Sequence, residues 1–334
     1  MKIALIIPIV LLGLSAHAQN STMKPDDFAE SLNKKLIVVT PGVNREIVKE
    51  LSKKKNLKDN PNGVEEYKEK AEKYQKMFLK CFKEIWTLHS EYELLTETEW
   101  YDREITKEDA KQMIVLKFVS FGAIQSSSGG ITVGYDSGGD DWQKEEDNET
   151  YGLYYHSFRP MKKTFFYLPD IDLDDLTERE MRLGLYYFQE NIKHNAQANK
   201  KGTDLIRDLF EIQQKENCAM LQSLTLNIID GQLDNKKNEK STENYTHKLE
   251  TISRDDWDKK LNGKTEGNAV ILFFPYGATV GGNSINGGSW LFMKVVIDCS
   301  TLKVLSVSGT PSTGGYGSGR YIGPKDFKVF SDCN

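Results

Sequence analysis

Cysteine is scarce in this sequence, and its arrangement does not suit a metal. The 334 residues include four cysteines: Cys81, Cys218, Cys299 and Cys333. They form neither a Cys-x-x-Cys pair nor a cluster with histidine, so a zinc site and thioredoxin-type redox chemistry lack their usual signals. Four scattered histidines lack metal-ligand spacing: His89, His156, His194 and His247. We expect no cofactor.

The chain also lacks a strong charge of one sign. The formal net charge is −5 and the pI is near 5.7. The main lysine run, Lys53-Lys54-Lys55, falls at the end of a predicted helix, where positive charge suits the helix dipole. We therefore expect no nucleic-acid partner.

Long hydrophobic runs are absent after residue 19, so we expect no transmembrane segment in the mature chain. Before that point, Lys2 precedes the apolar run Ile3–Leu14, and Ala16-His17-Ala18 forms a small-x-small cleavage site. Twelve residues of helix rise only about 18 Å, well short of a ~30 Å hydrocarbon core. We predict a signal peptide over residues 1–18, cleaved after Ala18, and a secreted or periplasmic bacterial protein.

Export would place the cysteines in an oxidising compartment, where four of them allow three pairings. Cys299 follows a predicted strand and Cys333 closes the chain, so a Cys299–Cys333 bridge is our first choice. Cys81 and Cys218 have apolar neighbours in predicted helices. For these two, a role as small buried hydrophobes is at least as good an interpretation as a bridge.

Recognisable catalytic and ligand-binding motifs are missing as well. The sequence has no Gly-x-Ser-x-Gly, P-loop or dinucleotide fingerprint. Asp170, Asp172 and Asp174 have the spacing of a calcium loop and form a weak calcium candidate. Asp175 stands where that loop needs glycine, and Met181 where it needs glutamate, so acids preceding a helix explain the pattern better.

What the sequence does contain is a pair of similar apolar runs. Ile114–Val119 is followed by Ser120-Phe121-Gly122-Ala123, and Ala269–Phe274 by Pro275-Tyr276-Gly277-Ala278. Each run is apolar at nearly every position, as expected of a strand covered on both faces. We interpret the two runs as the innermost strands of two related units.

The resemblance extends upstream to a tryptophan. Tyr92–Trp100 aligns with Leu249–Trp257, and each segment has a helix-capping residue followed three positions later by an acid. From Trp100 to Gly122 there are 22 residues, and from Trp257 to Gly277 there are 20. Each tryptophan is expected to pack a short helix onto its sheet.

Matching elements are expected around these landmarks. Gly-rich loops follow Gly122 and Gly277, and each leads into a hairpin. The hairpin strands are predicted at Tyr151–Phe158 with Thr164–Leu168, and at Trp290–Ile297 with Val304–Val307. The first strands are predicted at Leu36–Val39 and Leu224–Ile229. The fold class is thus α+β, with two mixed sheets and a β-α-β-α-β-β-β order in each unit.

We place the first unit at residues 19–200 and the second at 201–334. A long helix over residues 64–90 is inserted in the first, with apolar residues on one face. Capping residues predict two further helices, after Thr177 and after Thr203. The second unit ends in a Gly-rich tail, after which Asp326–Phe330 could return as an edge strand.

A duplicated scaffold without a duplicated acid, base or nucleophile favours a non-enzymatic exported protein that binds a ligand or partner at the cell envelope. The alternative is an exported hydrolase whose site gathers distant residues, such as His156 with Asp140 or Asp170. An exposed patch around Tyr316 and Tyr321 would favour binding.

Overall fold

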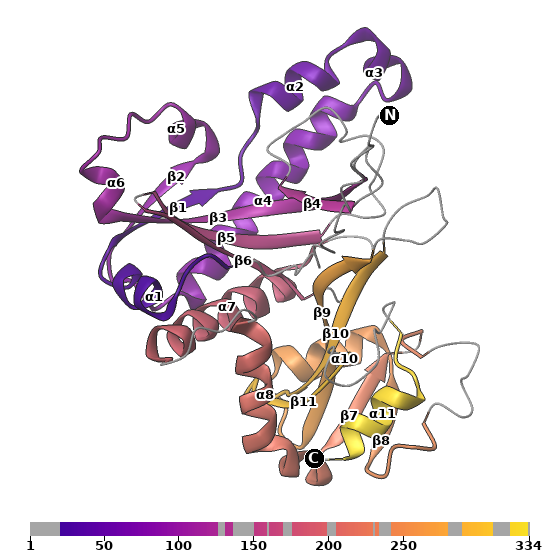
Figure 1. Cartoon of the computed structure of the whole chain (residues 1–334). Helices are drawn as coiled ribbons and strands as arrows, with labels where there is room; N and C mark the ends of the chain where they lie inside the picture. Colours follow the sequence, from indigo (N-terminus) through magenta and orange to yellow (C-terminus); the bar gives the residue numbers. More distant parts are fainter. Residues whose placement is uncertain are drawn as a thin grey trace, which may run out of the picture.

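The computed structural model describes residues 21–125, 131–135, 150–158, 160–169, 176–198, 205–229, 231–233, 242–279, 289–309 and 321–332. Two sheets with helices packed on them form two units (Figure 1). The predicted α+β class with two mixed sheets is confirmed.

The first sheet is built on the strand predicted at Ile114–Val119. Its strands are β1 (Lys35–Thr40), β2 (Tyr92–Thr96), β3 (Met113–Gln125), β4 (Ile131–Tyr135), β5 (Thr150–Phe158) and β6 (Met161–Tyr167). The order is β2-β1-β3-β5-β6, and β4 pairs with β3. β1 runs parallel to β2 and β3, whereas the other pairs are antiparallel.

The second sheet has the same order and directions. Its strands are β7 (Thr225–Ile229), β8 (Leu249–Ile252), β9 (Asn268–Thr279), β10 (Ser289–Asp298) and β11 (Val304–Ser308), in the order β8-β7-β9-β10-β11. β7 runs parallel to both neighbours, and β9, β10 and β11 are antiparallel in turn.

Strand pairing reproduces the register of the sequence alignment. In that alignment Glu93 stands opposite Glu250. In the first sheet Ile37 pairs with both Glu93 and Val115, and in the second Asn227 pairs with both Glu250 and Val270. Val115 and Val270 therefore hold equivalent positions in the two sheets.

Four helices precede β2 in the described chain, the first of them near its N-terminal end. They are α1 (Pro25–Ser31), α2 (Arg45–Leu51), α3 (Lys54–Asp59) and the long α4 (Gly63–Ile85). The apolar stripe of α4, including Phe78 and Phe82, is buried against the first sheet and α7 (Glu178–Gln197). The helix ends five residues before the predicted limit.

Short helices begin at the predicted capping residues. In α5 (Glu97–Tyr101) the Thr96 hydroxyl accepts from the Glu99 backbone N–H, and Glu99 accepts from the Thr96 N–H. In α10 (Arg254–Asn262) Ser253 caps the Asp256 N–H. The α7 helix has a full capping box at Thr177. The helix α6 (Asp109–Gln112) precedes β3.

The second sheet is covered by α8 (Leu205–Asn217), which packs on β11, and by the 3-10 helix η2 (Cys218–Ser223). The C-terminal element is a helix, α11 (Pro324–Ser331), so the prediction of an edge strand there was wrong. Pro324 occupies the first turn, Asp326 accepts from the Gly323 N–H, and Phe327 and Phe330 fall three apart on the buried face.

Both apolar central strands extend further than predicted. β3 and β9 continue through Gly122 and Gly277, which lie within paired strand rather than at the start of a loop. The strand β4, which pairs with the extension of β3, was not predicted because its five residues lie between two Gly- and Ser-rich stretches. The Gly-rich stretches themselves, residues 126–130, 136–149, 281–288 and 310–320, lie outside the described residues.

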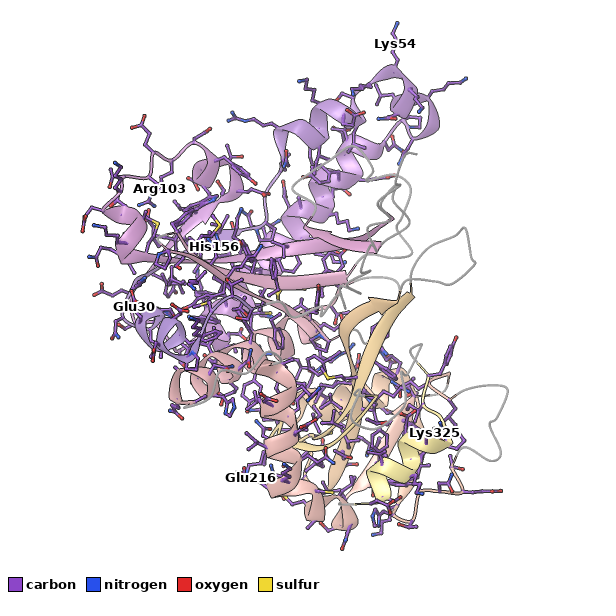
Figure 2. All side chains as sticks on the ribbon, in the orientation of Figure 1. Glu30, Lys54, Arg103, His156, Glu216 and Lys325 are labelled. Atoms are coloured by element: carbon purple, nitrogen blue, oxygen red, sulfur yellow. The ribbon has the colours of Figure 1, made fainter. Side chains whose placement is uncertain are left out.

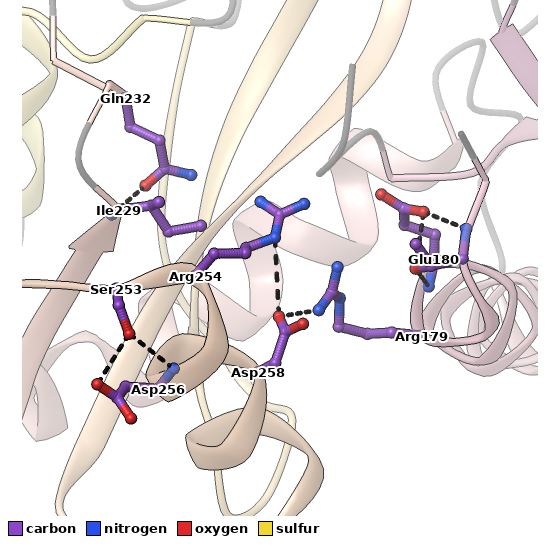
Figure 3. Close-up of polar contacts among 9 residues, drawn as sticks. Arg179, Glu180, Ile229, Gln232, Ser253, Arg254, Asp256 and Asp258 are labelled. Atoms are coloured by element: carbon purple, nitrogen blue, oxygen red, sulfur yellow. Dashed lines mark hydrogen bonds and ion pairs between the residues drawn. The ribbon is translucent and has the colours of Figure 1, made fainter. Parts of the chain in front are cut away.

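Helix α7 joins the units and lies between the two sheets (Figure 1). The Phe274 ring on β9 contacts rings from three other elements: Phe166 of β6, Tyr187 of α7 and Phe210 of α8. Arg179 at the start of α7 pairs with Asp258 of α10 (Figure 3). Its guanidinium lies 5.0 Å from the centre of the Trp257 ring. The first unit thus covers one face of the second sheet.

Candidate functional site

The two tryptophans mark equivalent faces of the sheets. Trp100 is buried with Val115, Ile37 and Val39 of the first sheet, and Trp257 is buried with Val270 of the second. We call these surfaces the Trp100 face and the Trp257 face. The predicted packing role of both residues is confirmed. What lies beside each tryptophan differs between the two faces.

On the Trp100 face, the residues beside Val115 are polar or aromatic. Reading across the strands, Val115 pairs with His156 and His156 with Lys163, whereas Lys117 pairs with Tyr154 and Tyr154 with Phe165. On the Trp257 face the corresponding rows are Val270–Ile297–Val304 and Leu272–Val295–Val307. These six residues are aliphatic and at most 2 % exposed. Helices α7 and α8 pack over this core, so aliphatic side chains suit it.

Lys117 is the most unusual of these residues. Its side chain is buried in the middle of an otherwise apolar strand, with the residue 6 % exposed. The ammonium lies 5.0 Å from the centre of the Tyr101 ring. Desolvation lowers the pKa of Lys117, and the nearby Glu97 carboxylate partly opposes that effect. Within the described chain, the ammonium has no hydrogen-bond acceptor and no salt-bridge partner. A buried charge in this state is costly.

His156 on β5 is the second buried polar group (Figure 2). Burial lowers the pKa of the imidazole to about 4, and the positive charge of Lys117 acts in the same direction. The ring is therefore neutral at pH 7. The backbone of Ser157 acts on the pKa in the opposite direction, but no described group makes a hydrogen bond of normal geometry to the Nδ1 atom. Among the described residues of this face, one buried ring nitrogen thus has no hydrogen-bond partner, and the ammonium of one buried lysine has no protein acceptor.

Aromatic rings flank the imidazole along the strand. The His156 ring stacks on Tyr154 at 4.6 Å, and Tyr154 stacks on Phe165 across the strands, also at 4.6 Å. Phe158 meets His156 edge-on and lies next to Trp100. Because the Tyr154 ring has a neighbour on each side, a ligand would meet its edge. Ring edges carry the positive part of the aromatic quadrupole.

Charges at the border of the face come from α5 and β6. Burial raises the pKa of the Glu97 carboxyl, while Lys117 and a hydrogen bond with Tyr101 lower it. Lys163 places its ammonium 5.4 Å from the centre of the Phe165 ring. The face therefore carries two lysines and one carboxylate, and it can hold a hydrogen-bonding ligand with a negative group.

Cysteine pairing differs from the prediction. Cys81 and Cys299 are buried free thiols, and burial raises the pKa of each to about 12. The Cys299–Cys333 bridge is therefore not present: Cys299 follows β10 in the core, and Cys333 lies outside the described residues. Cys218, at the start of η2, is in a disulfide.

Most of the remaining predicted site residues lie in stretches that the structure does not describe. Asp170, Asp172 and Asp174 lie outside the described residues, as do Asp140 and Tyr316, while Tyr321 is 52 % exposed. In the part of the chain that the structure covers, no group of three His, Cys, Asp or Glu residues could hold a metal ion. No helix of that part has the length and apolar character needed to cross a membrane.

A buried ion pair elsewhere is fully satisfied and fixes α11. Lys294 of β10 bonds to Asp326 Oδ2 at 2.6 Å, and Asp326 also accepts from the Ser308 hydroxyl at 2.5 Å and from the Gly323 N–H. Since every oxygen of this carboxylate has a partner, the cluster is explained by its structural role.

Sequence reasoning selected His156 but missed Lys117, Glu97 and Tyr101. The available signal was a single lysine inside a strand that is otherwise apolar. No protein-family model, curated protein or solved structure matches the chain.

Proposed function

We propose that the chain is an exported, non-enzymatic binding protein made of two duplicated units, with its ligand site on the Trp100 face. The observation that carries this proposal is the contrast between equivalent rows of the two sheets. Positions filled by valine, leucine and isoleucine on the Trp257 face hold Lys117, Tyr154, His156, Lys163 and Phe165 on the Trp100 face.

Duplication explains why such a contrast carries meaning. Equal strand order, equal directions and a shared register support an origin of both units from one ancestor. A sheet face that needs only a stable core would keep aliphatic residues. Replacing them with a buried lysine and histidine costs stability, which a ligand that satisfies them would offset.

The hydrolase alternative has less support. Its proposed acids, Asp140 and Asp170, lie outside the described residues. Among the described residues, no carboxylate and no hydroxyl or thiol is hydrogen-bonded to His156 Nδ1. A general base needs such a neighbour within hydrogen-bond reach, directly or through one water.

The proposal is tested by fragment screening of the mature protein, residues 19–334, with amide chemical shifts to locate each bound fragment. We expect fragments to map to β3, β5 and β6 around His156. The double variant His156→Ile, Lys163→Val introduces the residues of the equivalent row in the second sheet and should abolish binding while leaving the spectrum folded. Fragments that map only to other surfaces, or unchanged binding by the variant, would refute the site.

Export is tested separately. N-terminal sequencing of protein recovered from a bacterial host should begin at Gln19. An uncleaved cytoplasmic product would contradict this part of the proposal.

A further inference from the structure

We infer that the Trp100 face binds an oxyanion, either a carboxylate or a phosphate group, which accepts hydrogen bonds from the Lys117 ammonium and from His156 Nδ1. This inference rests on the proposed function and adds the chemical class of the ligand.

Hydrogen-bonding capacity is the first reason. Among the described residues no protein group accepts a hydrogen bond from the Lys117 ammonium, which carries three donors. His156 Nδ1 is buried without a partner and donates when the neutral ring holds its proton there. An oxygen-rich anion supplies acceptors to both groups, whereas a cation would add to the charge of Lys117. Lys117 and His156 lie on adjacent strands, one diagonal step apart, because Val115 pairs with His156 and Lys117 with Tyr154. Diagonal neighbours lie within reach of long side chains.

Charge around the site supports the same class. Lys163 adds a second ammonium near Phe165, and the edges of stacked rings are weakly positive. Among the described residues, Glu97 is the carboxylate that acts on Lys117, and the two form no salt bridge. Lys117 can therefore take a ligand anion as its direct partner, with Glu97 competing electrostatically.

Because Glu97 and the bound anion compete for Lys117, a variant that removes the charge of Lys117 and one that removes the charge of Glu97 should change anion affinity in opposite directions. Lys117→Met keeps the length of the side chain and removes the charge, so anion affinity should fall by about tenfold or more. Glu97→Gln keeps the shape of the competing group and removes its charge, so affinity should rise by roughly three- to tenfold. The control variant is Lys162→Met. Lys162 precedes Lys163 on the same strand, and its side chain points to the opposite face of the sheet. It should leave affinity unchanged.

The test uses four probes that share one ring: benzoate, phenyl phosphate, benzyl alcohol and benzylamine. Each is titrated into the mature protein, and amide shifts of β3 and β5 report binding. We expect one or both anions to bind at least about tenfold more tightly than the alcohol and the amine. Preference between the two anions identifies the group as carboxylate or phosphate.

Failure of this inference can be told from failure of the proposed function. If the alcohol or the amine binds the same face as tightly as the anions, the ligand class is wrong and the binding site stands. If neither these probes nor any screened fragment shifts the face, both are wrong. A Glu97→Gln variant that binds anions no more tightly than the unchanged protein would also overturn the inference, even if Lys117→Met had lost its fold.

Discussion

Burial of a neutral imidazole at His156 should make the protein less stable in mild acid. The pKa of this ring is about 4 in the folded chain, against an ordinary value of 6.5. The folded pKa is the lower of the two, so below pH 6.5 the unfolded chain binds the proton more readily. The stabilisation is therefore complete above pH 6.5 and is lost as the pH falls toward 4.

The size of the effect follows from the gap between the two pKa values. At about 1.4 kcal/mol for each pH unit, the whole gap corresponds to about 3 kcal/mol, of which about 2 kcal/mol is lost between pH 8 and pH 5. Because His156 is only 6 % exposed, solvent screening reduces this figure little. His89 is also buried with a lowered pKa, so the unmodified protein alone cannot isolate His156.

The variant His156→Phe isolates the contribution. Phenylalanine retains the ring between Tyr154 and Phe158 but takes up no proton. Urea unfolding of both proteins at pH 8, 7, 6 and 5 gives the free energy of unfolding for each. The unchanged protein should lose about 2 kcal/mol more than the variant over this range. Tyr154→Phe, which keeps the imidazole, should behave like the unchanged protein.

Two results would refute this reasoning. One is an equal loss of stability by the unchanged protein and His156→Phe. The other is direct: the imidazole signals of His156, followed by nuclear magnetic resonance, would titrate near pH 6.5. Either result would mean that the ring is solvated or has a partner in solution.

Three further predictions concern stability and covalent structure. Lys294→Met leaves the buried Asp326 carboxylate without its cation and should cost about 3 kcal/mol in urea unfolding, whereas replacing both residues by apolar ones should cost less. Gly309 has φ +83°, and an added Cβ would lie 2.7 Å from a backbone oxygen, so Gly309→Ala should lower the melting temperature more than the same change at Gly267, whose added Cβ meets open space. Mass mapping of unreduced protein should show Cys299 as a free thiol; a bridged Cys299 would contradict the structure.

The pairing of Cys218 can be settled in the same experiment. Cys218 is bonded while Cys81 and Cys299 are free, and the fourth cysteine of the sequence, Cys333, lies outside the described residues. η2 and α11 also share a core, where Leu221 lies with Phe327 and Phe330. We therefore predict a peptide joining Cys218 to Cys333. Free thiol at Cys218 would contradict it.

Local patterns in the sequence were sufficient for much of the fold. The runs at Ile114–Val119 and Ala269–Phe274 are central strands because an unbroken apolar run suits a strand covered on both sides. Capping residues located the starts of α5 and α10. By contrast, the segment Asp326–Phe330 of α11 was predicted to be a strand. Five residues are too few to distinguish the two-residue hydrophobic repeat of a strand from the 3.6-residue repeat of a helix.

The candidate site was less accessible because it depends on pairing between distant strands. His156 and Lys117 are 39 positions apart, and their proximity follows from the register of β3 with β5. The local signal, a single lysine inside an apolar strand, does not show which side chains from other strands lie beside Lys117. Which face of the second sheet is covered also depends on α7. This helix precedes the second unit in the sequence, so the strands of the second sheet do not themselves indicate that α7 packs on them.

The position of α7 gives the two equivalent faces different surroundings. This helix follows β6 and packs on the first sheet, as α11 follows β11 and packs on the second sheet. Helix α7 also covers the Trp257 face, because Arg179 lies over the Trp257 ring and Tyr187 contacts the Phe274 ring of β9. The Trp257 face was thereby committed to the interior, and aliphatic residues fit that environment. The Trp100 face is divided between two environments: Tyr154 and Phe165 pack against a cluster that includes Ile271 and Phe273 of the second sheet, whereas Trp100 packs within the first unit. Under the proposed function, the buried lysine and the unpartnered imidazole between these two parts of the face are retained because a ligand satisfies them.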